Sequence, residues 1–172
     1  MSEDLIFKPL DKNDLKFISE VYNFFILNST STYHVKPLFE KDMSDYFMLN
    51  RCVDLVDGFI IVLNENKIGF CLLKPYNKKK EGYNFTYEIT IYIKKNYQSK
   101  GIGKQAVMYL ENLAKKRKIH IIIAGICTEN DASIKLFERC GYQKCGFFKE
   151  VGYKFNKWLD NVYYQKVLDN QN

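Results

Sequence analysis

The sequence predicts a mixed α and β fold in a single domain that spans residues 1–172. Short stretches with helix and strand periodicity alternate along the whole chain, which is typical of this fold class. Two neighbouring apolar stretches are separated by only a short polar turn, which predicts an antiparallel pair of strands in the first half of the chain. No repeat, low-complexity tract or Pro/Gly/Ser-rich linker divides the chain, and 172 residues suffice for one sizeable core.

The first part of the chain predicts one strand and two helices. Leu5–Lys8 is the predicted strand, and Asp11 is a candidate N-cap for the helix that follows. A second helical region is predicted near Phe39–Asn50, after a loop rich in Ser and Thr. The apolar face of the first helix recurs at helical spacing and comprises Leu15, Ile18, Val21, Tyr22 and Phe25.

The middle of the chain predicts three strands. Phe59–Leu63 and Lys67–Leu73 flank the polar turn Asn64–Asn66, which indicates a hairpin. The segment Asn84–Ile93 then alternates cleanly, and this pattern predicts a strand with two different faces. One face carries Glu88, Thr90 and Tyr92, and the other carries Ile89, Ile91 and Ile93.

A glycine loop, QSKGIGKQA at Gln98–Ala106, opens the second half of the pattern. Apolar positions over Ile102–Ala114 follow helical spacing and end in the basic run Lys115–Lys118, which suits the negative end of a helix dipole. The remaining predicted elements are a strand at 119–126, a helix at about 131–139 closed by Gly141, and strands near 143–151 and 158–167.

Composition bounds the class of protein. The hydrophobic fraction is 47%, but no apolar run approaches the roughly eighteen residues that cross a bilayer. The first residues, MSEDLIFKPL, carry acids before a short apolar run, unlike a secretory signal, so we expect a cytoplasmic protein with no membrane partner. The formal charge of +6 favours an anionic partner, which a phosphorylated cofactor or a nucleic acid would provide.

The cysteines and histidines predict reduced thiols and no metal site. The five cysteines include no C-x-x-C pair, and an odd number is typical of free thiols in a reducing compartment. His34 and His120 lie far apart in sequence and have no cysteine or acid at ligand spacing. Packing in the core or at the surface is the preferred interpretation of both histidines.

The glycine loop predicts an anion site. A strand followed by glycines and a helix start aims free backbone N–H groups and the positive end of the dipole at one spot. The loop also matches the dinucleotide fingerprint G-x-G-x-x-A, but the preceding strand alternates, the loop comes late in the chain, and no acid for a ribose lies at the right distance. The Walker spacing is missing too, and a helix entry without a ligand stays open.

Two further runs extend the loop into a family pattern. With NDASIKLFERCGY (130–142), the loop resembles the acetyl-CoA site of the GNAT superfamily of N-acetyltransferases, whose pyrophosphate loop reads Q/R-x-x-G-x-G/A. The run EVGYKFNKWLDNVYYQKVL (150–168) is similar to the tail of the phosphinothricin and methionine sulfoximine N-acetyltransferase branch, as are residues 21–23 and 29–33. The resemblance implies a GNAT fold, in which helices flank a single central, mostly antiparallel sheet whose splayed middle strands hold acetyl-CoA.

The resemblance also implies an activity and a catalytic residue. Members of this branch transfer acetyl from acetyl-CoA to the primary amine of small amino-acid-like acceptors by direct attack, and Glu88 matches their proposed general base. The chemistry agrees, because an alkylammonium must lose a proton before it attacks and a carboxylate can accept that proton. Without the resemblance, an acid on the polar face of a strand is more often only solvated.

The cofactor residues follow from the same match. The resemblance places two isoleucines beside the pantetheine arm, the glycine loop on the pyrophosphate, and Asn130 further along the cofactor. A helix cap is an alternative and compatible role for Asn130. The predicted cofactor-binding residues are Ile91, Ile93, Gln98, Ser99, Lys100, Gly101, Ile102, Gly103, Lys104, Asn130 and Ser133.

The acceptor site is predicted from the loop before the Glu88 strand. The resemblance implies basic residues there that bind the acid group of the acceptor, and Lys78 and Lys79 stand where arginine is usual. Tyr33 is expected to line the other side. Lysine lacks the planar fork of arginine, and a solvated loop is the alternative role for the lysines. Core packing is the alternative for Tyr33.

Several positions near the C-terminus bear on the mechanism. Phe137 stands where relatives carry a tyrosine or histidine, and its ring cannot protonate the departing thiolate, so water, another hydroxyl such as Tyr142, or no dedicated acid serves that step. Asn156 replaces a glycine of the K-x-G-x-W tail, and we expect the turn to survive because Asn tolerates positive φ. Lys154 and Trp158 are expected to shape a dimer interface or a pocket wall.

Two alternatives stay open at the level of sequence. An enzyme of this superfamily could acetylate a polyamine, an antibiotic or a protein amine instead. A non-catalytic module that binds acetyl-CoA or nucleic acid is the other alternative, favoured by the basic charge and by lysine clusters at 78–80 and 115–118. The preferred prediction is a homodimeric enzyme with a small-molecule amine substrate and no nucleic-acid partner.

Overall fold

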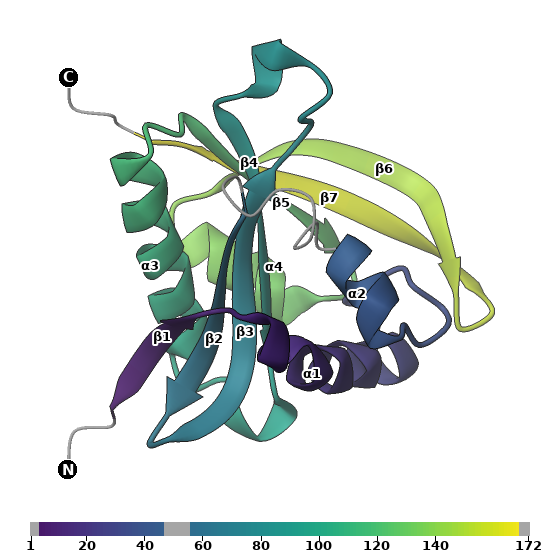
Figure 1. The fold of residues 1–172 in the computed structure, drawn as a ribbon. Coiled ribbons are helices and arrows are strands. Elements are labelled where there is room, and N and C mark those ends of the chain that lie inside the picture. Colours follow the sequence, from purple (N-terminus) through teal and green to yellow (C-terminus); the bar gives the residue numbers. More distant parts are fainter. Residues whose placement is uncertain (1–3, 47–55, 169–172) are drawn as a thin grey trace.

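The computed structural model describes residues 4–46 and 56–168, and strands from both parts form one sheet (Figure 1). The seven strands of these residues have the order β1-β2-β3-β4-β5-β7-β6. Every neighbouring pair is antiparallel except β4 and β5, so the mostly antiparallel sheet is confirmed. The strands are β1 (Leu5–Pro9), β2 (Asp57–Leu63), β3 (Asn66–Pro75), β4 (Thr86–Ile93), β5 (Ile121–Cys127), β6 (Gln143–Lys154) and β7 (Lys157–Val167).

Helices cover both faces of the sheet. α1 (Leu15–Asn28) and α2 (Glu40–Tyr46) lie on one face, while α3 (Ile102–Lys116) and α4 (Asp131–Arg139) lie on the other (Figure 1). The helical region expected near 39–50 is described up to residue 46, and residues 47–50 lie outside the described residues, as does Cys52.

The predicted cap residue Asp11 caps a short 3-10 turn, Lys12–Asp14, that precedes α1. The Asn13 amide donates to Asp11 Oδ1 at 2.7 Å, and the Asp11 amide donates to Asp14 Oδ2 at 3.0 Å. Asp14 is buried, and its Oδ1 lies 2.7 Å from Lys67 Nζ on β3. The cap therefore belongs to the 3-10 turn that precedes α1. Asp14, which completes the cap, is held there by its ion pair with Lys67 of the sheet.

Two β-hairpins turn on residues with positive φ. Asn64 and Glu65 (φ 47° and 67°) join β2 to β3, and Phe155 and Asn156 (φ 49° and 61°) join β6 to β7. Positive φ at both positions is typical of the type I′ turn, whose twist suits paired strands. The hairpin predicted around residues 64–66 is confirmed, and Asn156 takes the positive φ expected of the glycine that it replaces.

Two hydrophobic cores lie on opposite faces of the sheet. Leu110 of α3 and Ile89 of β4 belong to one core, and Tyr22 of α1 and Phe70 of β3 belong to the other. Each large apolar side chain that is fully buried contributes about 1.5–3 kcal/mol. Tyr92, on the second face of β4, lies 5.0 Å from the ring of Tyr22. The more polar face of β4 is thus also covered near the C-terminal end of the strand, because α1 lies across it.

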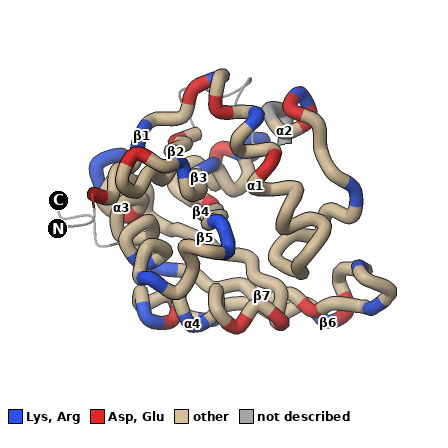
Figure 2. The backbone as a smooth tube through the Cα atoms, turned by 90° about the horizontal axis from the view of Figure 1, so that it is seen from below, with Lys and Arg blue, Asp and Glu red and all other residues tan. Residues whose placement is uncertain are grey.

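Charged residues of both signs are distributed along the backbone. Figure 2 shows basic and acidic segments interspersed along the backbone. The basic cluster at 115–118 includes Arg117, whose guanidinium lies 3.0 Å from Asp57 Oδ1 and joins the end of α3 to β2. Within residues 4–46 and 56–168, no helix is long and apolar enough to cross a bilayer, and no three potential metal ligands are grouped together.

Candidate active site

The central strands β4 and β5 separate part of the way along the sheet. Their parallel ladder has three residue pairs and ends at Glu88 and Ile123. β4 continues to Ile93 and β5 to Cys127, so each strand presents a backbone edge to the other beyond the ladder. The splay of the middle strands is confirmed, and an extended ligand can lie between these two edges.

Glu88 lies where the two strands separate. It stands opposite Lys74 across the β3–β4 ladder, and Lys74 Nζ lies 3.4 Å from Glu88 Oε2. The Glu88 side chain is 35% exposed, so a small molecule can reach a carboxylate that the ion pair holds in place. Burial raises the pKa of Tyr163, and the negative charge of Glu88 raises it further.

Lys74 is a site residue that sequence reasoning missed. Its position follows from the β3–β4 register, in which Leu73 faces Ile89 and Lys74 faces Glu88. The excursion between these two strands is too long for the turn to define the register from sequence alone. The only sign in the sequence that Lys74 belongs to the site was its position at the end of an apolar run.

The glycine loop joins β4 to α3 at the open end of the separated strands. A 3-10 turn, Lys95–Tyr97, precedes it, and Ser99 and Gly101 adopt positive φ of 59° and 79°. The Gln105 amide donates to Gly101 O, so the amides before Gln105 have no acceptor within the helix. These amides and the positive end of the α3 dipole form an anion site.

Individual residues of the loop have separate roles. Gln98 Nε2 donates to Ile93 O at 2.8 Å, which ties the loop to the end of β4. Glycine is favoured at position 101 by its positive φ, although the space around it is open. At Gly103 the reason is space, because a Cβ there would lie 3.1 Å from Leu136 on α4. Ser99, Lys100, Gly101 and Lys104 are exposed, and Ile102 is buried beneath them.

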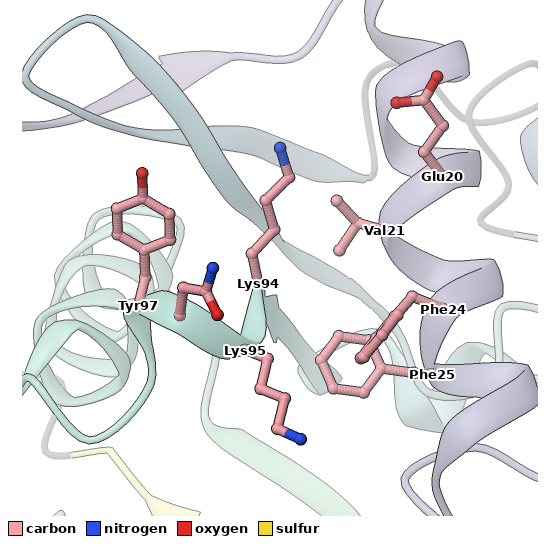
Figure 3. A pocket seen from close by; sticks show the side chains of 8 residues that line it. Glu20, Val21, Phe24, Phe25, Lys94, Lys95 and Tyr97 are labelled. Carbon is pink, nitrogen blue, oxygen red and sulfur yellow. The ribbon is translucent and has the colours of Figure 1, made fainter.

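A cavity of about 320 Å³ adjoins the glycine loop on the side of α1 (Figure 3). Apolar side chains of α1 form one wall, and the segment just before the loop forms the other. Figure 3 shows the side chains of Lys94 and Lys95 pointing in opposite directions from this segment. These two lysines, which were not among the predicted residues, follow directly after β4, and Lys94 Nζ lies 4.7 Å from the centre of the Phe17 ring on α1. The lining residues are Glu20, Val21, Phe24, Phe25, Lys94, Lys95, Asn96 and Tyr97.

Asn130 and Ser133 lie at the start of α4, across the opening from β4. Asn130 Oδ1 accepts a hydrogen bond from the Ser133 amide at 3.2 Å, which is the predicted helix cap. Asn130 Nδ2 donates to Ser31 Oγ at 3.1 Å. On β4, Ile93 is buried and Ile91 is half-buried against the same core. The structure therefore brings the predicted cofactor residues to the two sides of one opening.

The predicted acceptor residues lie in different settings. Lys78 and Lys79 are exposed in the excursion between β3 and β4, which projects from the sheet in Figure 1. Tyr33 Oη donates to Asp160 O at 3.1 Å. Burial raises the pKa of the Tyr33 phenol, as do nearby side chains that include Tyr163, the neighbour of Glu88. Tyr33 thus contacts β7, the strand that pairs with β5, while the two lysines lie in the excursion between β3 and β4.

Phe137 and Tyr142 belong to the core. Phe137 is 6% exposed, and its ring lies 4.9 Å from that of Tyr142, which is 3% exposed. Burial raises the pKa of Tyr142, and Glu111 of α3 raises it further. Tyr142 therefore packs between α4 and α3, where a phenol has a structural role.

Comparisons with known proteins agree with this geometry. The model of the Acetyltransferase (GNAT) family matches residues 19–142. A Salmonella typhimurium L-methionine sulfoximine/L-methionine sulfone acetyltransferase is 27% identical, over 92% of each chain. A Streptomyces coelicolor phosphinothricin N-acetyltransferase is 25% identical, over 94% of this chain and 95% of that one. A Sinorhizobium meliloti phosphinothricin acetyltransferase solved with acetyl-CoA has a TM-score of 0.88 at 26% identity, covering 98% of this chain and 89% of that one.

The chain belongs to the acetyltransferase (GNAT) family. It is an N-acetyltransferase, and its cofactor is acetyl-CoA. The residues fit this cofactor, because the separated edges of β4 and β5 can flank a pantetheine arm and the amides before Gln105 can bind its pyrophosphate. Lys95, Lys100 and Lys104 are exposed and add positive charge to the segment 95–104 that carries this loop.

Proposed function

We propose that this protein transfers acetyl from acetyl-CoA to the primary amine of a small amino-acid-like compound, such as phosphinothricin, methionine sulfoximine or methionine sulfone. One observation carries the proposal: a half-exposed carboxylate, Glu88, lies where the cofactor-binding strands separate. The names of relatives that match more than nine-tenths of this chain support the acceptor class.

Glu88 is the proposed general base. A primary alkylamine is mostly protonated at neutral pH, as an alkylammonium. Glu88 accepts the proton of this ammonium directly or through one water, while Lys74 holds the carboxylate in position. When bound, acetyl-CoA supplies the acetyl group as a thioester. Phe137 provides no proton at the position where relatives carry an acid, and a thiol is acidic enough to leave without one.

The acceptor is proposed to bind between the β3–β4 excursion and the loop that follows α1. Lys78 and Lys79 would attract the acid group of the acceptor from one side, and Tyr33 would line the other. The position of Lys74 at the foot of the excursion supports this arrangement, because it brings that segment to Glu88. Tyr33 Oη donates to Asp160 O of β7, the strand that pairs with β5, and this contact supports the opposite wall.

The decisive experiment measures thiol release from acetyl-CoA with a panel of acceptors. The panel contains methionine sulfoximine, methionine sulfone, phosphinothricin, free amino acids and polyamines. We expect turnover with the first three, and a fall in kcat of about 10²- to 10⁴-fold in Glu88→Gln, because the base is lost. Glu65→Gln, at an exposed acid in the β2–β3 turn, at the other end of β3 from Lys74, should retain full activity.

Acetyl-CoA binding is measured separately by thermal shift. A saturating cofactor, at about 100 times Kd, stabilises by about 2.7 kcal/mol, and Glu88→Gln should keep the shift. Activity of Glu88→Gln within threefold of the wild type would refute the base. Preference for polyamines would refute the acceptor class, and cofactor binding without any turnover would favour a non-catalytic module.

A homodimer and a cytoplasmic location are part of the same proposal. The β6–β7 hairpin exposes several large apolar side chains, each about half exposed or more, which a second copy of the chain would cover. Four cysteines of the described residues are free, and thiols stay reduced in the cytoplasm. The exposed apolar residues are Phe147, Phe148, Val151, Tyr153, Phe155 and Trp158.

A further inference from the structure

The loop between α1 and α2 crosses the opening between β4 and β5. We name residues 29–33 the crossing loop. Tyr92 Oη donates to Ser31 O at 3.0 Å, and Asn130 Nδ2 donates to Ser31 Oγ at 3.1 Å. Tyr92 belongs to β4 and Asn130 follows β5, so the two bonds connect the two sides of the opening. Glu88 and Tyr92 share one face of β4, so the crossing loop lies on the Glu88 side.

A buried lysine of the β6–β7 hairpin holds the crossing loop. Lys154 is 3% exposed, and its Nζ donates to Ser29 O at 2.7 Å and to Thr32 O at 2.8 Å. Burying an ammonium is unfavourable unless its N–H groups donate hydrogen bonds. Here the ammonium donates two hydrogen bonds to backbone carbonyls of the crossing loop. Without Lys154, two carbonyls in a confined space would lose their partner.

Neighbouring contacts make the crossing loop one packed unit with the hairpin. Tyr22 Oη lies 2.6 Å from Thr32 Oγ1, which ties the loop to α1. Tyr33 donates to Asp160 O of β7, and its ring lies so close to Gly152 of β6 that any Cβ there would collide with it. A displacement of the loop would therefore move Tyr33 relative to the hairpin.

We propose that Lys154 is a positioning residue for the acceptor site: its ammonium holds the crossing loop where it walls the Glu88 side of the opening. The inference rests on the proposed function, because it requires an acceptor that enters beside Glu88. The glycine loop is anchored independently, through Gln98 to the end of β4 and through Gly103 to α4. Lys154 thus affects the acceptor more than the cofactor.

The test is a comparison of Lys154→Met with the wild type by steady-state kinetics. Methionine keeps the length and apolar stem of the side chain and removes the donors. We expect KM for the acceptor, measured with methionine sulfone, to rise about tenfold or more, while kcat and KM for acetyl-CoA stay within threefold. Amide hydrogen exchange at residues 29–34 should also become faster, because the crossing loop loses two hydrogen bonds.

Lys157→Met is the matched control. Lys157 lies on the same hairpin and is exposed, and its Nζ lies 2.6 Å from Glu129 Oε1 instead of donating to the crossing loop. This substitution should change neither the kinetic constants nor the exchange at residues 29–34. If Lys154→Met does not fold, Tyr22→Phe loosens the same loop by removing one hydroxyl, and we expect acceptor KM to rise about threefold with acetyl-CoA KM unchanged.

The outcomes separate this inference from the proposed function. Absence of turnover with every acceptor in the wild type would refute the proposed function. Turnover by Lys154→Met with acceptor KM within twofold of the wild type would refute the positioning role alone. An equal rise in KM for acceptor and for acetyl-CoA would also refute it, because Lys154 would then support the whole opening.

Discussion

The exposure of a charged side chain separates structural from chemical roles in this protein. Asp14 and Lys154 are almost fully buried, and both use their charge on partners within the fold. Glu88 is also charged but is 35% exposed at the edge of an opening, as its proposed role as a general base requires. His34 lies between these cases, half-buried with Nδ1 3.0 Å from Tyr22 Oη.

His34 predicts a loss of stability in mild acid. Burial lowers the pKa of His34 below its ordinary value of 6.5, and the positive charge of Lys154 lowers it further. As the pH falls through 6.5, the unfolded chain takes up a proton before the folded chain does, so the free energy of unfolding decreases. We expect Tm to fall more between about pH 7.5 and pH 5 in the wild type than in His34→Gln.

The control for this prediction is the second histidine. His120 is exposed, and His120→Gln should keep the pH dependence of the wild type. Thermal unfolding followed by circular dichroism at each pH measures all three proteins. Identical curves of Tm against pH in the wild type and His34→Gln would show that His34 does not link stability to pH.

The strand β3 shows how one element positions the opening. It pairs with β4 continuously from Lys74, opposite Glu88, to Gly69, opposite Ile93. At Gly69 the two strands approach so closely that a Cβ would collide with the Tyr92 carbonyl. The position of the β4 edge that faces β5 therefore depends on a glycine on the other side of the strand.

Gly69→Ala should destabilise the fold and impair the cofactor site together. The added methyl meets backbone, which cannot rotate away, so we expect a loss of about 2–3 kcal/mol and a fall in Tm of roughly 5–10 °C. KM for acetyl-CoA should rise as β4 shifts. Gly82→Ala, where nothing lies within 4 Å of the new Cβ, should change stability by no more than about 0.5 kcal/mol. Equal stability of the two variants would contradict the close approach.

At the scale of the whole molecule, the β6–β7 hairpin connects the surface to the site. Its inner side carries Lys154 and Gly152 against the crossing loop, and its outer residues include Trp158, which is 62% exposed. The hairpin extends beyond the rest of the sheet in Figure 1. An apolar surface of this kind favours association with a second copy, and that association would stabilise the hairpin behind the crossing loop.

The proposed homodimer predicts a mass of twice 20.4 kDa by light scattering. Phe155→Glu combined with Trp158→Glu places charge on the apolar outer side of the hairpin, and we expect the mass to fall to that of one chain. Lys8→Glu, which changes an exposed charge on β1 at the opposite edge of the sheet from β6, should leave the mass unchanged. A single-chain mass in the wild type at micromolar concentration would refute the dimer.

Local patterns predict the elements of this fold well because the information they carry is local. The alternation of residues 84–93 predicts β4, and the spacing after Gly101 predicts α3. The polar turn at 64–66 predicts a hairpin, and Asn156 is expected to take positive φ. The glycine loop, read with the runs that follow it, predicts the family that the comparisons confirm. Each of these inferences depends on residues close together in the chain or on a motif of fixed spacing.

Contacts between distant parts of the chain were decided only by the tertiary structure. The sequence by itself determined the strands, the helix that follows the glycine loop and the presence of an acid at position 88. Only the fold ended the β4–β5 ladder beside that acid, set Lys74 opposite Glu88, and brought Lys154 to a loop more than 120 residues earlier. The physical reason is that register and burial depend on the packing of whole elements, which no local pattern records.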